Sequence, residues 1–179
     1  MQDEAGKARM LRNVDQALAD AAAGGHTGTI ARLQAIKGQQ WEDEPLLVDA
    51  VGRADGSGDA MAQAFATFRY GQYLGIHGQF EKSLDHTARA IEILGAQGER
   101  LQQGHMMAGA GRCWYARAGK LDESLAYAAR AREAGDLFGD ARLRAWRSAE
   151  AEPYLYKGLW DEVVQVTEEA LPVAWEIRE

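Results

Sequence analysis

The chain has 179 residues, of which 46% are hydrophobic, and it carries a formal net charge of −7 at pH 7. Nucleic acids and anionic membrane surfaces bind proteins through Lys and Arg, so an acidic chain is expected to bind neither. No apolar run approaches the roughly 20 residues that span a bilayer. The acidic N-terminus lacks the pattern of a signal peptide, and the single cysteine permits no internal disulfide, so a cytoplasmic protein is expected.

The sequence of residues 1–58 predicts three helices. Residues 4–23 form the first, because apolar residues recur there at helical spacing and two glycines follow. A second helix over Thr27–Lys37 is expected to end in a turn at Gly38. The third is expected to begin near Glu42, where acids and Pro45 favour a helix start. Together, residues 26–57 are interpreted as a degenerate two-helix repeat.

A turn made of glycine, any residue, a large apolar residue and one or two acids recurs at Gly78, Gly119 and Gly158, spaced by 41 and 39 residues. Glycine suits the end of a helix, and acids suit the first turn of the next one. A second marker, glycine followed by an acid that can cap a helix, recurs in the same register at Gly58-Asp59, Gly98-Glu99 and Gly139-Asp140. Two markers with one period define a repeated two-helix unit. They predict helices over 60–77, 80–96, 100–118, 121–137, 141–157 and 160–178.

Within these helices, four residues carry further expectations. Pro153 is expected to kink the helix over 141–157, because proline lacks a backbone donor. Ala90, Ala131 and Ala170 follow the repeat spacing and are expected where helices cross closely.

These patterns predict an all-α fold, an α-solenoid of antiparallel helix pairs in one continuous array. Residues 1–58 hold N-terminal helices and the degenerate repeat, and 59–179 hold three helix pairs over 59–97, 99–138 and 140–179. The next marker would fall at about residue 180, so a fragment of a longer array is expected.

The segments Tyr73–Leu84 and Trp114–Leu125 resemble the helix–turn–helix centre of tetratricopeptide repeats, and the likeness covers residues 59–179. The unit is longer than the usual repeat of about 34 residues. Such long repeats resemble the arms of multidomain bacterial signalling proteins, among them nucleotide cyclases and ATP-dependent transcription activators. The resemblance implies a right-handed superhelix and a non-catalytic module that binds a protein or peptide and regulates a larger protein. No phosphate-binding G-x-x-x-x-G-K-[ST] motif occurs in the chain.

In tetratricopeptide-like folds the first helix of each pair lines a concave groove. The resemblance therefore implies a ligand-binding groove formed by Phe65, Phe68, Gln72, Ile76, Met106, Cys113, Arg117, Glu152 and Tyr156. Aromatic residues, methionine and a few charges are typical of peptide-binding surfaces, although the phenylalanines could instead pack between repeats. The position of Gln72, Cys113 and Glu152 carries asparagine in repeats that clamp C-terminal carboxylates, so that mode is not expected.

No catalytic residue, metal site or cofactor is predicted. Cys113 and His105 lie about 12 Å apart on one helix, too far for a thiol–imidazole hydrogen bond. The four histidines show no metal-binding spacing. Two alternatives to an open binding module stay open: a small-ligand or peptide sensor, which needs an enclosed groove, and a helical enzyme.

The last predicted helix carries a broad apolar side. Trp160, Val164, Leu171 and Trp175 recur at helical spacing on that side. An uncovered apolar stripe at the end of a helical array is an association surface. We therefore expect a weak homodimer through the C-terminal helix.

Overall fold

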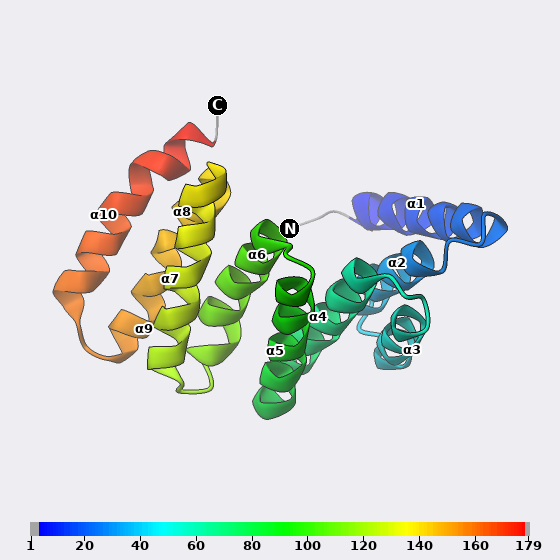
Figure 1. The fold of residues 1–179 in the computed structure, drawn as a ribbon, viewed down its shortest axis with the longest axis horizontal. Coiled ribbons are helices and arrows are strands. Elements are labelled where there is room, and N and C mark those ends of the chain that lie inside the picture. Colours follow the sequence, from blue (N-terminus) through cyan, green and yellow to red (C-terminus); the bar gives the residue numbers. More distant parts are fainter. Residues whose placement is uncertain (1–3, 178–179) are drawn as a thin grey trace.

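The computed structural model describes residues 4–177, without the side chains of Glu4, Ala5, Lys7, Arg112, Cys113 and Arg147. All regular structure in the described range is helical, which confirms the predicted all-α class (Figure 1). The α-helices are α1 (Glu4–Ala23), α2 (Thr27–Gln40), α3 (Glu44–Asp55), α4 (Ala60–Ile76), α5 (Phe80–Ala96), α6 (Arg100–Ala110), α7 (Leu121–Phe138), α8 (Ala141–Ala145), α9 (Ala151–Tyr156) and α10 (Trp160–Glu176).

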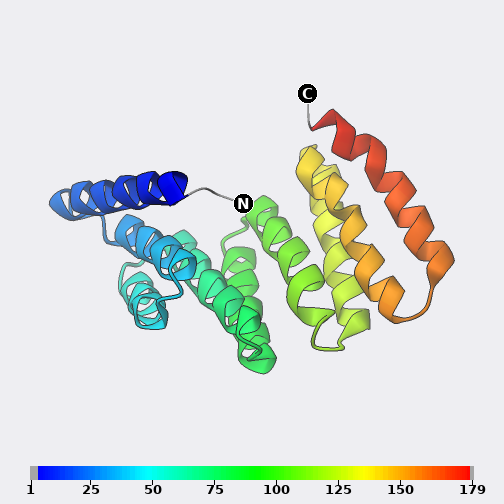
Figure 2. The ribbon, with the colours of Figure 1, turned by 180° about the vertical axis from the view of Figure 1, so that it is seen from behind.

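Helices that follow one another in the chain lie side by side. The most extensive packing joins α2 to α3, α4 to α5 and α6 to α7, and α10 packs on both α8 and α9. Successive pairs lie next to each other across the molecule (Figures 1 and 2). In the middle of the molecule, α5 contacts α6. No helix in the described range is long and apolar enough to cross a membrane.

The repeated glycine turn has the predicted conformation. Gly78 has a φ of +76°, and the Gln79 N–H beyond it donates to the Leu74 carbonyl at 2.9 Å. This bond satisfies a carbonyl that the end of α4 leaves without an intrahelical donor. Glycines with positive φ stand at the equivalent positions and at the second marker: Gly119, Gly158, Gly58, Gly98 and Gly139.

The predicted turn at Gly38 is wrong. Gly38 is buried inside α2, which continues to Gln40, and the chain turns instead at Glu42 with a φ of +56°. The reason is packing, because a Cβ at Gly38 would lie 2.8 Å from Cγ of Leu47 on α3. Glycine at this position permits close helix approach rather than a turn.

Two of the predicted helices are not α-helical throughout. The helix predicted over 100–118 changes to a π-helical segment at Gly111–Tyr115, where the Ser124 hydroxyl donates to the Gly111 carbonyl at 2.8 Å. The helix predicted over 141–157 is interrupted by a 3₁₀ segment at Trp146–Glu150. Pro153 follows this segment and cannot donate to the carbonyl four residues before it, so an irregularity occurs in the helix for which a kink was predicted.

The repeated alanines, predicted at helix crossings, lie in the interior. Ala90, Ala131 and Ala170 are all buried. The apolar residue six positions after each turn glycine is not equally buried along the chain. Leu84 on α5 is 4% exposed, whereas Val164 on α10 is 56% exposed. Leu125, at the equivalent position of α7, is half-buried.

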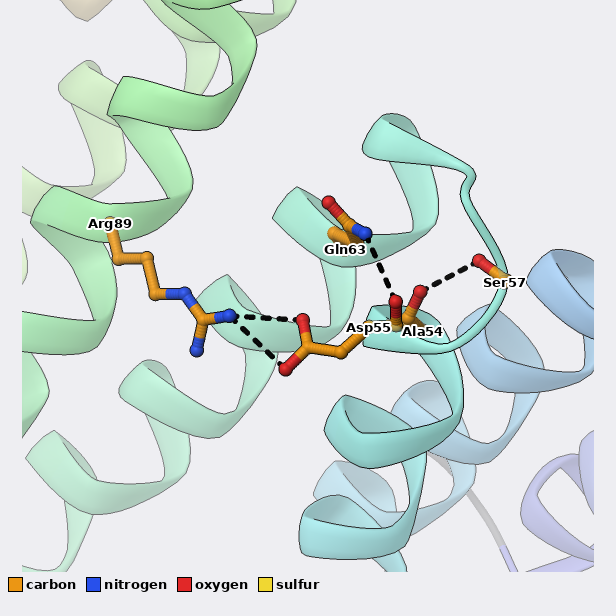
Figure 3. A network of polar contacts seen from close by, with 5 residues as sticks. All are labelled: Ala54, Asp55, Ser57, Gln63 and Arg89. Atoms are coloured by element: carbon orange, nitrogen blue, oxygen red, sulfur yellow. Dashed lines mark hydrogen bonds and ion pairs between the residues drawn. The ribbon is translucent and has the colours of Figure 1, made fainter.

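An ion pair connects α3 with α5. Nη2 of Arg89 lies 3.0 and 3.1 Å from the two carboxylate oxygens of Asp55 (Figure 3). The Ser57 hydroxyl donates to the Ala54 carbonyl at 2.7 Å, and the Gln63 amide donates weakly to the Asp55 carbonyl at 3.4 Å. These bonds hold the turn between α3 and α4 against α5.

Leu84→Ala is expected to lower the free energy of unfolding by about 2–5 kcal/mol, because it removes a fully packed side chain. Val164→Ala at the equivalent exposed position is expected to change it by less than about 0.5 kcal/mol. Urea unfolding followed by circular dichroism measures both. Equal losses for the two variants would contradict the observed difference in burial.

Candidate functional site

A cleft lies between α4 and α6, with one residue of α2 in its lining. We call it the α4–α6 cleft, and its volume is about 280 Å³. Helical spacing places residues 61, 65, 68, 69 and 72 of α4 on one side. The lining residues are Arg32 of α2; Met61, Phe65, Phe68, Arg69 and Gln72 of α4; and Gln102, His105 and Met106 of α6.

The α4–α6 cleft brings together four of the predicted groove residues: Phe65, Phe68, Gln72 and Met106. Both phenylalanines are half-buried and also pack against the core clusters on either side. Their rings therefore contribute to the packing between helix pairs and to the cleft wall at once.

The remaining predicted residues lie elsewhere. Arg117, Glu152 and Tyr156 line a second, wider hollow of about 600 Å³ between α9 and the turn before α7. The Tyr156 hydroxyl donates to Glu152 at 3.2 Å there. Ile76 is 62% exposed and lines neither hollow, and the Cys113 side chain lies outside the described residues.

The polar centre of the α4–α6 cleft is Arg69. Its guanidinium carbon lies 4.9 Å from the ring centroid of Phe65, a cation–π contact. Nη1 donates to the Gln39 side-chain oxygen at 2.6 Å, and the Gln39 amide donates in turn to Gln72 at 3.0 Å. Nε is buried and has no hydrogen-bond acceptor among the described residues. Burial lowers the pKa of the Arg69 guanidinium, which nevertheless stays protonated.

Arg32 adds a second positive charge to the cleft. It is half-buried and makes no hydrogen bond or ion pair within residues 4–177. No carboxylate is among the described lining residues. By contrast, a third hollow of about 350 Å³ between α6 and α7 contains Glu133 together with its arginines. The α4–α6 cleft is thus a locally cationic, apolar site in an acidic chain.

His105 lies on the α6 side of the cleft. Its Nε2 is 3.2 Å from Oδ2 of Asp140, whose Oδ1 accepts the Leu143 N–H at the start of α8. The Leu143 hydrogen bond, together with His105, lowers the pKa of the Asp140 carboxyl. Asp140 therefore fixes the imidazole of His105 and caps α8 at the same time.

Sequence reasoning missed Arg32, Met61, Arg69, Gln102 and His105 as cleft residues. Arg69 could have been found, because it lies four residues after Phe65 and so shares its helix face. Arg32 gave no such signal, since α2 lies outside the clear repeats. No group of metal-binding side chains occurs among the described residues.

A search of known protein-family models and of curated proteins finds no match to the chain. The functional assignment therefore depends on the residues and geometry of the clefts.

Arg69→Met is expected to leave the free energy of unfolding within about 1 kcal/mol of the wild type or to raise it, because it removes a half-buried charge that no acid among the described residues compensates. Arg132→Met is the matched comparison, since the Arg132 guanidinium lies 2.6 Å from Glu150, which is 5% exposed. Losing that bond is expected to cost about 1–3 kcal/mol. Urea unfolding measures the loss of stability in both variants. If Arg69→Met lost as much as Arg132→Met, the folded chain would already compensate the charge of Arg69.

Proposed function

We propose that the chain is a non-catalytic protein- or peptide-binding module, built as a tetratricopeptide-like α-solenoid. The side-by-side order of successive helix pairs and the repeated glycine turns support this architecture. The repeat length further supports a regulatory role in a cytoplasmic bacterial signalling protein. We expect the chain to bind neither nucleic acid nor membranes, because its net charge is −7.

The observation that carries the proposal is the α4–α6 cleft. Its half-buried phenylalanines and methionines offer apolar contact, and its arginines and glutamines offer hydrogen-bond donors. Small-molecule sites usually measure about 300–1,000 Å³, and this cleft of about 280 Å³ lies near the lower end of that range. Its size suits one large side chain of a peptide, and a small-ligand sensor is the alternative.

The chemistry of the α4–α6 cleft also disfavours the helical-enzyme alternative. His105 is the only imidazole among its described lining residues, and none of those residues carries a hydroxyl or thiol that it could activate. The His105 ring is instead held by Asp140, which caps the start of α8.

A second proposed interaction is self-association through α10. Trp160, Val164, Leu171 and Trp175 are all more than half exposed. The repeat register aligns Trp160, Val164 and Leu171 with Phe80, Leu84 and Ile91, and the last two are buried beneath α6 and its π-helical extension. This face of a second helix is therefore built to receive another helix.

The spacing of the α10 stripe suits a second copy. The four residues are separated by four, seven and four positions, so the pattern reads the same in both directions. An antiparallel twofold pairing would bring Trp160 to the partner's Trp175 and Val164 to the partner's Leu171. Four such side chains bury on the order of 400 Å² per chain, below the roughly 600 Å² per partner of stable interfaces, so the dimer is weak.

Phe65→Ala is expected to weaken peptide binding at least tenfold, because it removes an apolar wall of the cleft. Ile76→Ala is the control, since Ile76 lies on the same helix but lines none of the three hollows described above. Peptides selected from a random displayed library on the wild type, and then measured by fluorescence anisotropy, provide the test. Failure to enrich any peptide, or equal binding by both variants, would contradict the assignment.

Self-association is expected to strengthen as salt rises. The α10 helix carries five acids and no base over Trp160–Glu176, so two copies repel each other and salt screens that repulsion. Sedimentation velocity at about 50 and 500 mM NaCl measures the effect. Trp160→Glu is expected to abolish the dimer, while Ile76→Glu leaves it intact. A wild type that remains monomeric at high concentration and high salt would refute the dimer.

A further inference from the structure

We propose that the α4–α6 cleft is selective for acidic peptide segments, in which carboxylate side chains flank a large apolar residue. Arg69 and Arg32 hold the carboxylates, and the phenylalanines and methionines receive the apolar side chain. This inference rests on the proposed peptide-binding function and names the chemistry of its ligand.

The first reason to expect an acidic ligand is that Arg69 has a hydrogen-bond donor without an acceptor in the described part of the chain. A guanidinium has five N–H donors, and the hydrogen bond recorded for Arg69 goes to the neutral Gln39 amide. Its Nε is buried without an acceptor among the described residues. A buried donor without an acceptor is costly, and an anionic acceptor relieves that cost while forming short, charge-assisted bonds. A ligand carboxylate therefore supplies the hydrogen-bond acceptor that Arg69 lacks among the described residues.

Several other basic side chains do have acidic partners, although the Nε of Arg144 is also buried without a hydrogen-bond partner among the described residues. The sequence has 27 acids and 20 lysines and arginines, so acidic partners are in excess. Arg89 pairs with Asp55, Arg132 with Glu150 and Lys37 with Asp15. In contrast, Arg32 and Arg69 face one cleft without a carboxylate from the described residues.

The apolar lining specifies the second part of the ligand. Phe65 and Phe68 present rigid half-buried rings, and Met61 and Met106 lie with them in the same lining. Methionine adapts to differently shaped apolar partners because its side chain is unbranched and polarizable. The Phe65 ring also contacts the Arg69 guanidinium, so the apolar and cationic parts of the cleft adjoin. A ligand must therefore place its carboxylate and its apolar side chain close together.

A peptide fits these features better than a nucleic acid. The cleft offers two guanidinium groups rather than a continuous basic track, and the net charge of −7 opposes a long polyanion. A peptide with acids beside Leu, Ile, Phe or Trp carries both required groups within two or three residues.

The test compares matched peptide panels on the intact chain. Twelve-residue labelled peptides carry Leu, Ile, Phe or Trp at the centre, flanked either by Asp and Glu or by Asn and Gln, with both termini blocked. Fluorescence anisotropy is expected to show that the best acidic peptide binds at least tenfold more tightly than its amide counterpart. Arg69→Gln and Arg32→Gln are each expected to reduce this preference at least fivefold, whereas Arg89→Gln leaves it unchanged.

The outcomes separate this inference from the proposed function. Equal binding of acidic and amide peptides that Phe65→Ala abolishes would overturn the acidic selectivity and keep peptide binding. A preference that neither arginine variant changes would also overturn the inference. Absence of binding by every peptide would overturn both proposals. Displacement of the acidic peptide by a thymidine oligonucleotide at similar concentration would assign the cleft to nucleic acid instead.

Discussion

The arrangement of the helices depends on close contact at residues that have no side chain. A Cβ on Gly75 would lie 2.4 Å from the Trp114 ring, and one on Gly71 would lie 3.1 Å from Thr87. These glycines bring α4 against the π-helical segment after α6 and against α5. The residues that line the cleft lie on α4 as well. The close contacts at Gly71 and Gly75 therefore help to fix where α4 places these residues.

The repeated features could be predicted from sequence because each has a local physical cause. A positive φ favours glycine, so Gly78 and its equivalents mark turns whatever surrounds them. Gly38 shows the limit of this inference, because its lack of a side chain serves contact with Leu47, a tertiary requirement that the sequence does not distinguish. Pro153 predicted one irregular helix. The π-helical segment that begins at Gly111, where the Ser124 hydroxyl donates to the Gly111 carbonyl, was not predicted.

The candidate site was only partly predictable for the same reason. The apolar stripe through Phe65 and Phe68 follows from helical periodicity. That Arg69 has no acidic partner among the described residues could not be predicted from periodicity, because it depends on which residues α2 and α6 place nearby. The opposing charges have a further consequence: the net charge of −7 repels an acidic ligand at long range, whereas the arginines attract it at contact. Affinity must therefore come from short-range hydrogen bonds and apolar contact.

The Arg69 side chain offers the most direct measurement. In ¹H–¹⁵N spectra of the intact chain, the Nε–H resonance of Arg69 can be identified by its loss in the Arg69→Gln variant. Addition of an acidic peptide is expected to shift this resonance and to slow its exchange with water. The Nε–H resonance of Arg89, whose Nη2 is paired with Asp55 outside the cleft lining, is expected to stay unchanged. Saturable binding that leaves the Arg69 resonance in place would contradict recognition through this cleft.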